Sequence, residues 1–146
     1  MKRKVLFVCP SNSLHSVIAE ALLKRLDSKH FEAASAGLTC ANIHPFTVEV
    51  LKEIGTEVTA KRRTVFEALQ DDFDYVITFG DPADWKDISM RGAEHFHWRF
   101  DNPLAQPLER EEGLRLFRAI RDQIAQRLNL FTLVVLRPVE MASSAN

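Results

Sequence analysis

The sequence has few cysteines, no excess of positive charge and no long hydrophobic run. Cys9 and Cys40 are the only cysteines among its 146 residues, too few for the disulfide framework of a small secreted protein or for a four-cysteine zinc site. The 19 lysines and arginines nearly balance the 20 aspartates and glutamates, so a general role in binding nucleic acid is not expected. No apolar run reaches the roughly 18 residues of a membrane span. These absences predict a cytoplasmic protein with neither a nucleic acid nor a membrane as its partner.

The residues that are present predict one globular domain of the α/β class. Hydrophobic residues make up 46% of the chain and charged residues 27%, which is typical of a folded domain. Short runs rich in β-branched and aromatic residues predict strands over 5–8, 31–36, 75–79 and 95–98. Apolar residues at helical spacing predict helices over 16–27, 45–54 and 109–128. A capping box formed by Thr64 and Glu67 predicts a short helix over 64–69. This alternation predicts a four-stranded parallel sheet with helices on both faces, a three-layer sandwich.

The loop after the first strand has the features of an anion-binding site. In a parallel sheet such sites lie at the carboxyl ends of the strands, and Cys9 stands where the first strand ends. Residues 10–15 lead into the first turn of a helix, so successive backbone N–H groups and the helix dipole attract an anion. The same field favours a nucleophilic thiolate. From the residues alone two alternatives stay open: Cys9 attacks a tetrahedral oxyanion, or it is a small buried hydrophobic side chain.

The segment from Val5 to Ala21 resembles the signature of the low-molecular-weight protein tyrosine phosphatases and their relatives, the single-domain arsenate reductases. In that signature a strand is followed by a loop with Cys, Arg and Ser, and then by a helix that begins near Ala-Glu-Ala. Further agreement lies in Ser35-Ala36-Gly37, His44-Pro45 with residues 50–55, and His97-Trp98 with Asn102-Pro103. The resemblance covers about residues 4–130. It implies the fold of this family for a domain of residues 1–130, followed by an extra C-terminal tail, 131–146.

The resemblance also implies roles for the residues of the loop. Cys9 matches the nucleophile of the family, Asn12 the residue that braces the loop, and Ser16 the hydroxyl that hydrogen-bonds the thiolate. The anion-binding loop then consists of Pro10, Ser11, Asn12, Ser13, Leu14 and His15. The expected ligand is a phosphate, sulfate or arsenate oxyanion, the expected partner is a phosphoprotein or a thiol reductant, and no cofactor is implied. His44, His95 and His97 show no metal-ligand spacing with a shared face, so we predict no metal.

Two departures from the signature fall on the chemistry. His15 stands where the family has its Arg, and an imidazole lacks the planar fork that grips two oxygens. It is either a weak cation at the anion or a solvent-facing cap of the first helical turn. Asn102 stands at the general-acid position, where the family has Asp before Pro, and loss of a general acid typically costs ~10²–10⁴-fold. Asp101 replaces it if the loop register shifts; otherwise Asp101 is only a turn residue.

Three functions therefore stay open. Hydrolysis of phosphotyrosine would pass through a cysteinyl-phosphate on Cys9. Arsenate reduction would need a second thiol, since Leu14 and Gly80 stand where relatives have further cysteines; an external thiol such as glutathione could supply it. Cys40 is either a thiol without a role in the loop before the second helix, or it resolves a Cys9 sulfenate if the two sulfurs approach within disulfide reach. We predict weak thiol chemistry on phosphate or arsenate. The alternative is a catalytically silent relative that binds an anion or a protein partner, because His15 and Asn102 replace the Arg and Asp of the family.

A hydrophobic segment, residues 128–136, follows the last predicted helix. About four such side chains gain ~1.5–3 kcal/mol each on burial. One interpretation is that they lengthen the helix and pack on the sheet. The other is a short strand from Thr132 to Leu136, which is rich in β-branched residues and is followed by Pro138. Because an added strand needs a partner, we predict a homodimer through residues 130–137.

Overall fold

The computed structural model describes the chain except for residues 106, 145 and 146. Its elements follow one another in the order β1 (Arg3–Cys9), α1 (His15–Asp27), β2 (Phe31–Gly37), α2 (Pro45–Lys52), α3 (Val65–Ala68), β3 (Tyr75–Thr78), the 3₁₀ turn η1 (Pro82–Trp85), β4 (Glu94–His97), the 3₁₀ turn η2 (Pro103–Ala105) and α4 (Arg110–Ser144). The predicted strands and helices all occur, with ends that differ by at most two residues, except that the last helix was predicted to end at 128 and continues to Ser144. In the described residues, no helix is both long and apolar enough to cross a bilayer.

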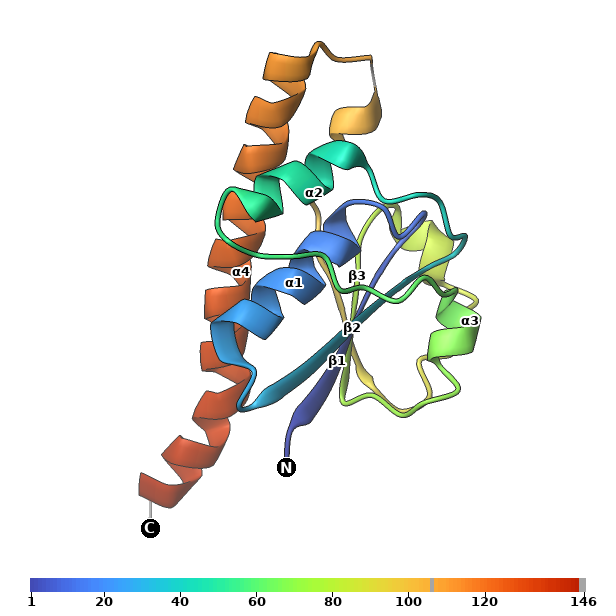
Figure 1. The fold of residues 1–146 in the computed structure, drawn as a ribbon. Helices are drawn as coiled ribbons and strands as arrows, with labels where there is room; N and C mark the ends of the chain where they lie inside the picture. Colours follow the sequence, from blue (N-terminus) through green and yellow to red (C-terminus); the bar gives the residue numbers. More distant parts are fainter. Residues whose placement is uncertain (106, 145–146) are drawn as a thin grey trace.

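The strands form one parallel sheet in the order β2-β1-β3-β4 (Figure 1). This arrangement confirms the predicted four-stranded parallel sheet. Cys9 is level with Gly37 of β2, and Val8 is level with Thr78 of β3. Because the strands are parallel and in this register, their carboxyl ends meet at one edge, where Cys9 and the loop after it lie.

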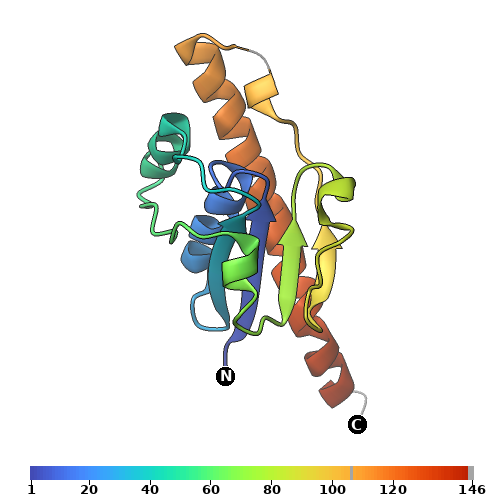
Figure 2. The same cartoon turned by 90° about the vertical axis from the view of Figure 1, so that its right-hand side faces the viewer.

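Helices cover both faces of the sheet (Figure 2), so the predicted three-layer sandwich is confirmed. The larger core cluster lies between the sheet and helices α1 and α4, and includes Phe7, Ile18 and Phe117. The smaller cluster lies on the face covered by α3 and η1, and includes Leu6 and Trp85. Strand β1 contributes to both, since Phe7 points to one face and Leu6 to the other, and both are fully buried.

Two helices begin at sequence signals that satisfy their free N–H groups. Thr64 accepts a hydrogen bond from the Glu67 N–H while the Glu67 carboxylate accepts one from the Thr64 N–H, which confirms the predicted capping box at α3. Helix α2 begins at Pro45, and His44 Nδ1 accepts from the Phe46 N–H at 3.0 Å. Each cap therefore sets the residue at which the preceding loop ends and the helix begins.

The C-terminal segment is helical, so the predicted strand from Thr132 to Leu136 is wrong. Helix α4 passes through residue 130 without a break, because the apolar spacing of its buried stripe continues into Phe131 and Val135. Phe131 packs against the aromatic rings of four residues from the strands and the chain after β4: Phe31, Tyr75, Phe96 and Trp98. The structure instead has the other predicted arrangement, in which this segment lengthens the helix and packs on the sheet.

Replacement of Phe131 by alanine should destabilise the whole domain, because its side chain is only 6% exposed and fills an aromatic cluster. We expect Phe131→Ala to lower the free energy of unfolding by about 3–5 kcal/mol. The matched control is Leu133→Ala two residues away, where the side chain is 66% exposed and a change of at most about 0.5 kcal/mol is expected. Urea unfolding of both variants measures this, and equal small losses would show that α4 does not pack here beyond residue 130.

Candidate functional site

Cys9 lies at the carboxyl end of β1 in a short network of buried polar groups. Its side chain is 2% exposed, and Sγ lies 2.8 Å from Ser16 Oγ. The Ser16 hydroxyl donates its proton to Asn12 Oδ1, also at 2.8 Å. Because a hydroxyl has one proton, Cys9 S–H must donate to Ser16 in this arrangement. If the thiol ionises, the Ser16 hydroxyl can turn and donate to the thiolate, which is the role that the sequence suggested for it.

The carbonyl groups of the loop are tied to the segment before α2. Backbone N–H groups of Thr39 and Ala41 donate to the Pro10 and Ser11 carbonyls at 3.0 Å. The Ser13 carbonyl accepts from the His44 N–H at 3.2 Å and from the buried Thr47 hydroxyl at 3.0 Å. A trans peptide points its N–H opposite to its C=O, and the chain has no cis peptide.

These bonds decide where the loop's own N–H groups point. The N–H groups of Ser11, Asn12 and Leu14 follow the anchored carbonyls and so point away from residues 39–47. Among the described residues, none of these three groups donates a hydrogen bond. Free N–H groups in a loop at the start of a helix are donors of the kind that can hold an anion.

The loop passes so close to β2 that a side chain cannot fit between them. A Cβ atom at Gly37 would lie 2.8 Å from the Asn12 nitrogen and 2.4 Å from the Thr39 oxygen, which is closer than carbon atoms approach such groups. Asn12 itself has φ of +52°, a conformation that Asn adopts more readily than most residues. The loop geometry therefore requires glycine at position 37 and favours asparagine at position 12.

The His15 side chain is buried beside the loop instead of facing solvent, so the predicted solvent-facing cap is wrong. It is 9% exposed, and its ring stacks on Phe79 and Phe100 at centroid distances of 5.6 and 6.4 Å. Its Nε2 lies 3.0 Å from the Asp101 carbonyl oxygen; since a carbonyl only accepts, Nε2 carries the proton. Burial lowers the pKa of this imidazole below its ordinary value of 6.5, and the bond to Asp101 opposes that shift only in part. The ring is therefore neutral near pH 7.

Asp101 and Asn102 lie on the loop that His15 holds. Both side chains are exposed. Asn102 Oδ1 accepts a hydrogen bond from the Leu104 N–H at 3.0 Å, so the Asn102 side chain caps η2. The hydrogen bond from His15 Nε2 to the Asp101 carbonyl holds Asp101 close to the loop after Cys9. Asp101 also has an ionisable carboxyl group, whereas the neighbouring Asn102 has none.

The other positions that the sequence singled out surround the loop. Leu14 is buried, and Gly80 has φ of +95° and packs against the Pro10 ring. Cys40 is exposed and unbonded to Cys9 in this structure. It stands between Thr39 and Ala41, the two residues that hold the carbonyls directly after Cys9. Cys40 therefore lies next to the loop.

Sequence reasoning missed the anchoring role of residues 39–47 and the aromatic surroundings of His15. Thr47 was the one sequence signal of this anchoring role, because it is a polar residue on the apolar face of the helix predicted over 45–54. Of the three histidines considered as metal ligands, His95 and His97 lie two residues apart on β4, while His44 caps α2. His95 Nε2 and His97 Nδ1 each lie 2.8 Å from the Thr78 hydroxyl. Within the described part of the chain, however, no group of three or more potential ligand side chains could hold a metal ion.

The chain is similar to known proteins over nearly its whole length. Residues 4–139 match the family described as low molecular weight phosphotyrosine protein phosphatase. An arsenate reductase of Halalkalibacterium halodurans is 31% identical over 132 residues, which cover 89% of this chain and 95% of that protein. A glutaredoxin arsenate reductase of Synechocystis sp. is 29% identical, with 86% of this chain and 93% of that protein covered.

Solved structures agree with the sequence comparisons. An arsenate reductase from Archaeoglobus fulgidus superposes with a TM-score of 0.66 at 28% identity, covering 86% of this chain and 98% of that one. A structure described as an arsenate reductase in the phosphate binding state has a TM-score of 0.69 at 26% identity, covering 88% and 95%. This chain therefore shares its fold with each of these two proteins over nearly the whole length of both partners in the comparison.

The buried neutral state of His15 predicts a loss of stability at mildly acidic pH. As pH falls below 6.5, His15 gains a proton in the unfolded chain before it does so in the folded one. Stability is therefore full above this pH and declines as pH falls towards the folded pKa. Burial also lowers the pKa of His44 and His95, so a variant is needed to isolate His15.

His15→Phe keeps a ring between Phe79 and Phe100 but cannot titrate. Urea unfolding at about pH 7.5 and about pH 5.5 should show a smaller loss of stability for this variant than for the wild-type protein. An equal loss in both proteins would contradict a neutral, buried His15.

Proposed function

Because the chain belongs to the low molecular weight phosphotyrosine protein phosphatase family, we propose that Cys9 performs thiol chemistry on a tetrahedral oxyanion. The observation that carries this proposal is the geometry at the end of β1. Cys9 Sγ lies 2.8 Å from Ser16 Oγ, at a loop whose carbonyl groups are tied to residues 39–47. The N–H groups that face the other way are the donors that would hold the oxygens of the anion.

Arsenate is the oxyanion that the comparisons favour, since several relatives are named arsenate reductases. The Cys9 thiolate would attack arsenic and form an S–As bond, and water would leave with the aid of a proton. A second thiol would then attack the Cys9 sulfur, forming an S–S bond. The electrons of the broken S–As bond stay on arsenic, which leaves as arsenite while two thiols become one disulfide.

The second thiol must come from outside the loop. Leu14 and Gly80 offer no sulfur, so we propose a small thiol such as glutathione as the co-reactant. The name of the Synechocystis relative, glutaredoxin arsenate reductase, supports this choice for a similar chain. Cys40 is the internal alternative, because it is exposed and its neighbours Thr39 and Ala41 bond the loop after Cys9.

Hydrolysis of phosphotyrosine is less well supported by the site. A phenolate leaving group needs a proton, and the Asn102 amide, engaged with the Leu104 N–H, cannot give one. The neutral His15 ring, turned to the Asp101 carbonyl, supplies no positive charge for the oxyanion. The same two observations support the alternative function, a catalytically silent relative that binds an oxyanion without turnover.

Two assays separate these functions. We expect the purified protein to reduce arsenate in the presence of glutathione and glutaredoxin, and to hydrolyse p-nitrophenyl phosphate only weakly. Cys9→Ser should abolish both activities, while Cys40→Ser should leave arsenate reduction intact if the thiol is external. A protein that binds phosphate in calorimetry but turns over neither compound would be the silent relative.

Restoring the family side chains should restore phosphatase chemistry. In the double variant His15→Arg with Asn102→Asp, turnover of p-nitrophenyl phosphate should rise by about 10²–10⁴-fold, because a charged clamp and a general acid are regained. The single variants serve as controls for each contribution. A folded double variant without any gain would show that the loop is not positioned for attack on phosphate.

We also propose that helix α4 carries a homodimer contact. Leu130, Leu133 and Val134 are more than 60% exposed, and such apolar side chains on one helix suit a second copy of the chain. Replacement of all three by glutamine should yield a monomer in light scattering, while the wild-type chain scatters as a dimer. The core residues Phe131 and Val135 stay in place, so the variant should fold; a wild-type monomer would end the proposal.

A further inference from the structure

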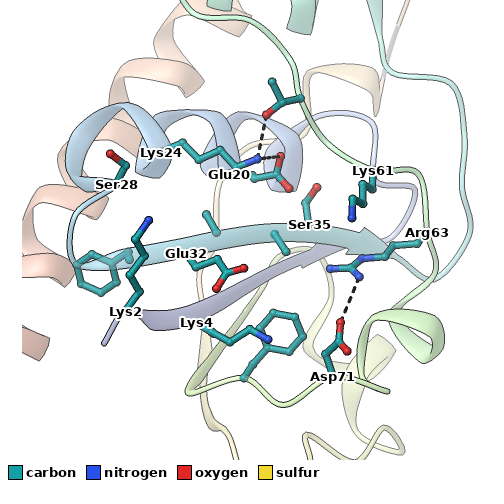
Figure 3. A pocket seen from close by; sticks show the side chains of 15 residues that line it. Lys2, Lys4, Glu20, Lys24, Ser28, Glu32, Ser35, Lys61, Arg63 and Asp71 are labelled. Atoms are coloured by element: carbon teal, nitrogen blue, oxygen red, sulfur yellow. Dashed lines mark hydrogen bonds and ion pairs between the residues drawn. The ribbon is translucent and has the colours of Figure 1, made fainter.

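A polar groove lies beside β2, away from the loop after Cys9 (Figure 3). It has a volume of about 360 Å³, which is within the size range of pockets that bind small molecules. None of residues 9–16 lines it. The chain around Lys61 and Arg63 closes the end nearest to Gly37, whose N–H donates to the Arg63 carbonyl at 3.2 Å. The groove is therefore separate from the site at Cys9.

The end of the groove that Lys61 and Arg63 close suits a phosphate group. The side chains of both residues line this end (Figure 3). Arg63 has a long ion pair of 3.8 Å with Asp71, whose side chain is 60% exposed. In the described part of the chain no carboxylate pairs with Lys61. A guanidinium fork beside a lysine is a typical donor set for the oxygens of a phosphate.

The charge of the whole lining favours an anion as well. The basic side chains are Lys2, Lys4, Lys24, Lys61 and Arg63, and the acidic ones are Glu20, Glu32 and Asp71. The groove is thus positive on a protein whose formal charge is −1. A concave site of this sign raises the local concentration of anions above that at the rest of the surface.

The carboxylates of the groove suit a ligand that also has hydroxyl groups. Glu20 is engaged within the protein, since its carboxylate lies 3.3 Å from Lys24 Nζ. Burial raises the pKa of the Glu20 carboxyl, and the charges of Lys24 and Arg63 oppose that rise. Glu32 is exposed and pairs with no basic side chain among the described residues, so its oxygens can accept from hydroxyl groups. A phosphorylated sugar fits this combination, whereas a second anionic group would meet the charge of Glu32.

The segment that closes the groove also contacts the residues that anchor the loop after Cys9. The side chains of Lys61 and Arg63 line the groove, while the guanidinium group of Arg62, between them, donates to the Ala41 carbonyl. The Ala41 N–H in turn donates to the Ser11 carbonyl at 3.0 Å. A ligand that holds Lys61 and Arg63 therefore restrains the residue that links this segment to the loop.

We propose that the groove is an effector site for a small sugar phosphate. The phosphate group lies between Lys61 and Arg63, and the sugar hydroxyl groups are directed towards Glu32. The bound molecule orders the chain around Arg62 and thereby stabilises the hydrogen bond from Ala41 to the loop after Cys9. It acts without contact to Cys9 itself.

An NMR titration of the full chain with ribose 5-phosphate tests the site. The backbone amides of Lys61, Arg63 and Glu32 should shift, while ribose without the phosphate should leave them unchanged. Lys61→Glu should weaken binding about tenfold, because it reverses a charge at the phosphate. Lys61 is exposed, so this variant should fold. The matched control is Lys86→Glu, an exposed lysine outside the groove, which should leave binding unchanged.

Inorganic phosphate separates a sugar phosphate site from general attraction of anions. At the same concentration it should cause much smaller shifts at the amides of Lys61 and Arg63, because it lacks the hydroxyl groups that reach Glu32. Equal shifts with both compounds would show a basic surface without selectivity and would overturn the proposal. The absence of any shift at these amides with ribose 5-phosphate would overturn it as well.

Hydrogen exchange tests the connection to the loop after Cys9. Saturation with ribose 5-phosphate should slow exchange of the Ala41 N–H by about fivefold. The Trp98 N–H, which bonds the Thr78 carbonyl at the other edge of the sheet, reports general stabilisation by the ligand and should slow less. Equal slowing of both amides, or no slowing at Ala41 with the groove occupied, would show that the ligand does not act on the loop and would overturn its role as an effector.

Discussion

The candidate site depends on the hydrogen bonds that hold the loop carbonyls against residues 39–47. Each bond from this segment turns one peptide plane, and thereby aims the following N–H group at the position where an anion would lie. The close approach is possible because Gly37 has no side chain. Gly37 in turn stands next to Cys9 because of the register between β1 and β2. The register between β1 and β2 thus determines where the N–H groups of the loop after Cys9 point.

His15 supports this loop in a different way from a cation. Its neutral ring lies between Phe79 and Phe100 and bonds the Asp101 carbonyl, so it connects the anion-binding loop to the segment that carries Asp101 and Asn102. Aromatic surroundings of this kind suit an uncharged ring, since a buried charge without a partner is strongly unfavourable. An uncharged histidine at position 15 therefore agrees with its packing, and it forms a fixed contact between two loops.

Local patterns predicted most of the fold and half of the site. The apolar run 5–8, the capping box at Thr64 and the stripe of α4 each depend on neighbours in the sequence, and each was found. The helical end of α4 was ambiguous because Thr132–Leu136 has strand propensity, and packing of Phe131 in the aromatic cluster decides for the helix. The surroundings of His15 could not be predicted, since Phe79 and Asp101 are distant in sequence and approach it only through the sheet.

The backbone and side-chain parts of the site respond differently to sequence change. The N–H groups are held by strand register and by Gly37 and Thr47, so they persist when residues at positions 15 and 102 change. In the function that we propose, such a site has backbone donors for an oxyanion, while His15 and Asn102 supply neither a permanent charge nor a general acid. Ester hydrolysis suffers most, because a phenolate must leave with a proton. In arsenate reduction the departing group is an As–OH oxygen, which takes a proton from solvent and leaves as water, and for this reason we propose arsenate over a phosphoester as the substrate of Cys9.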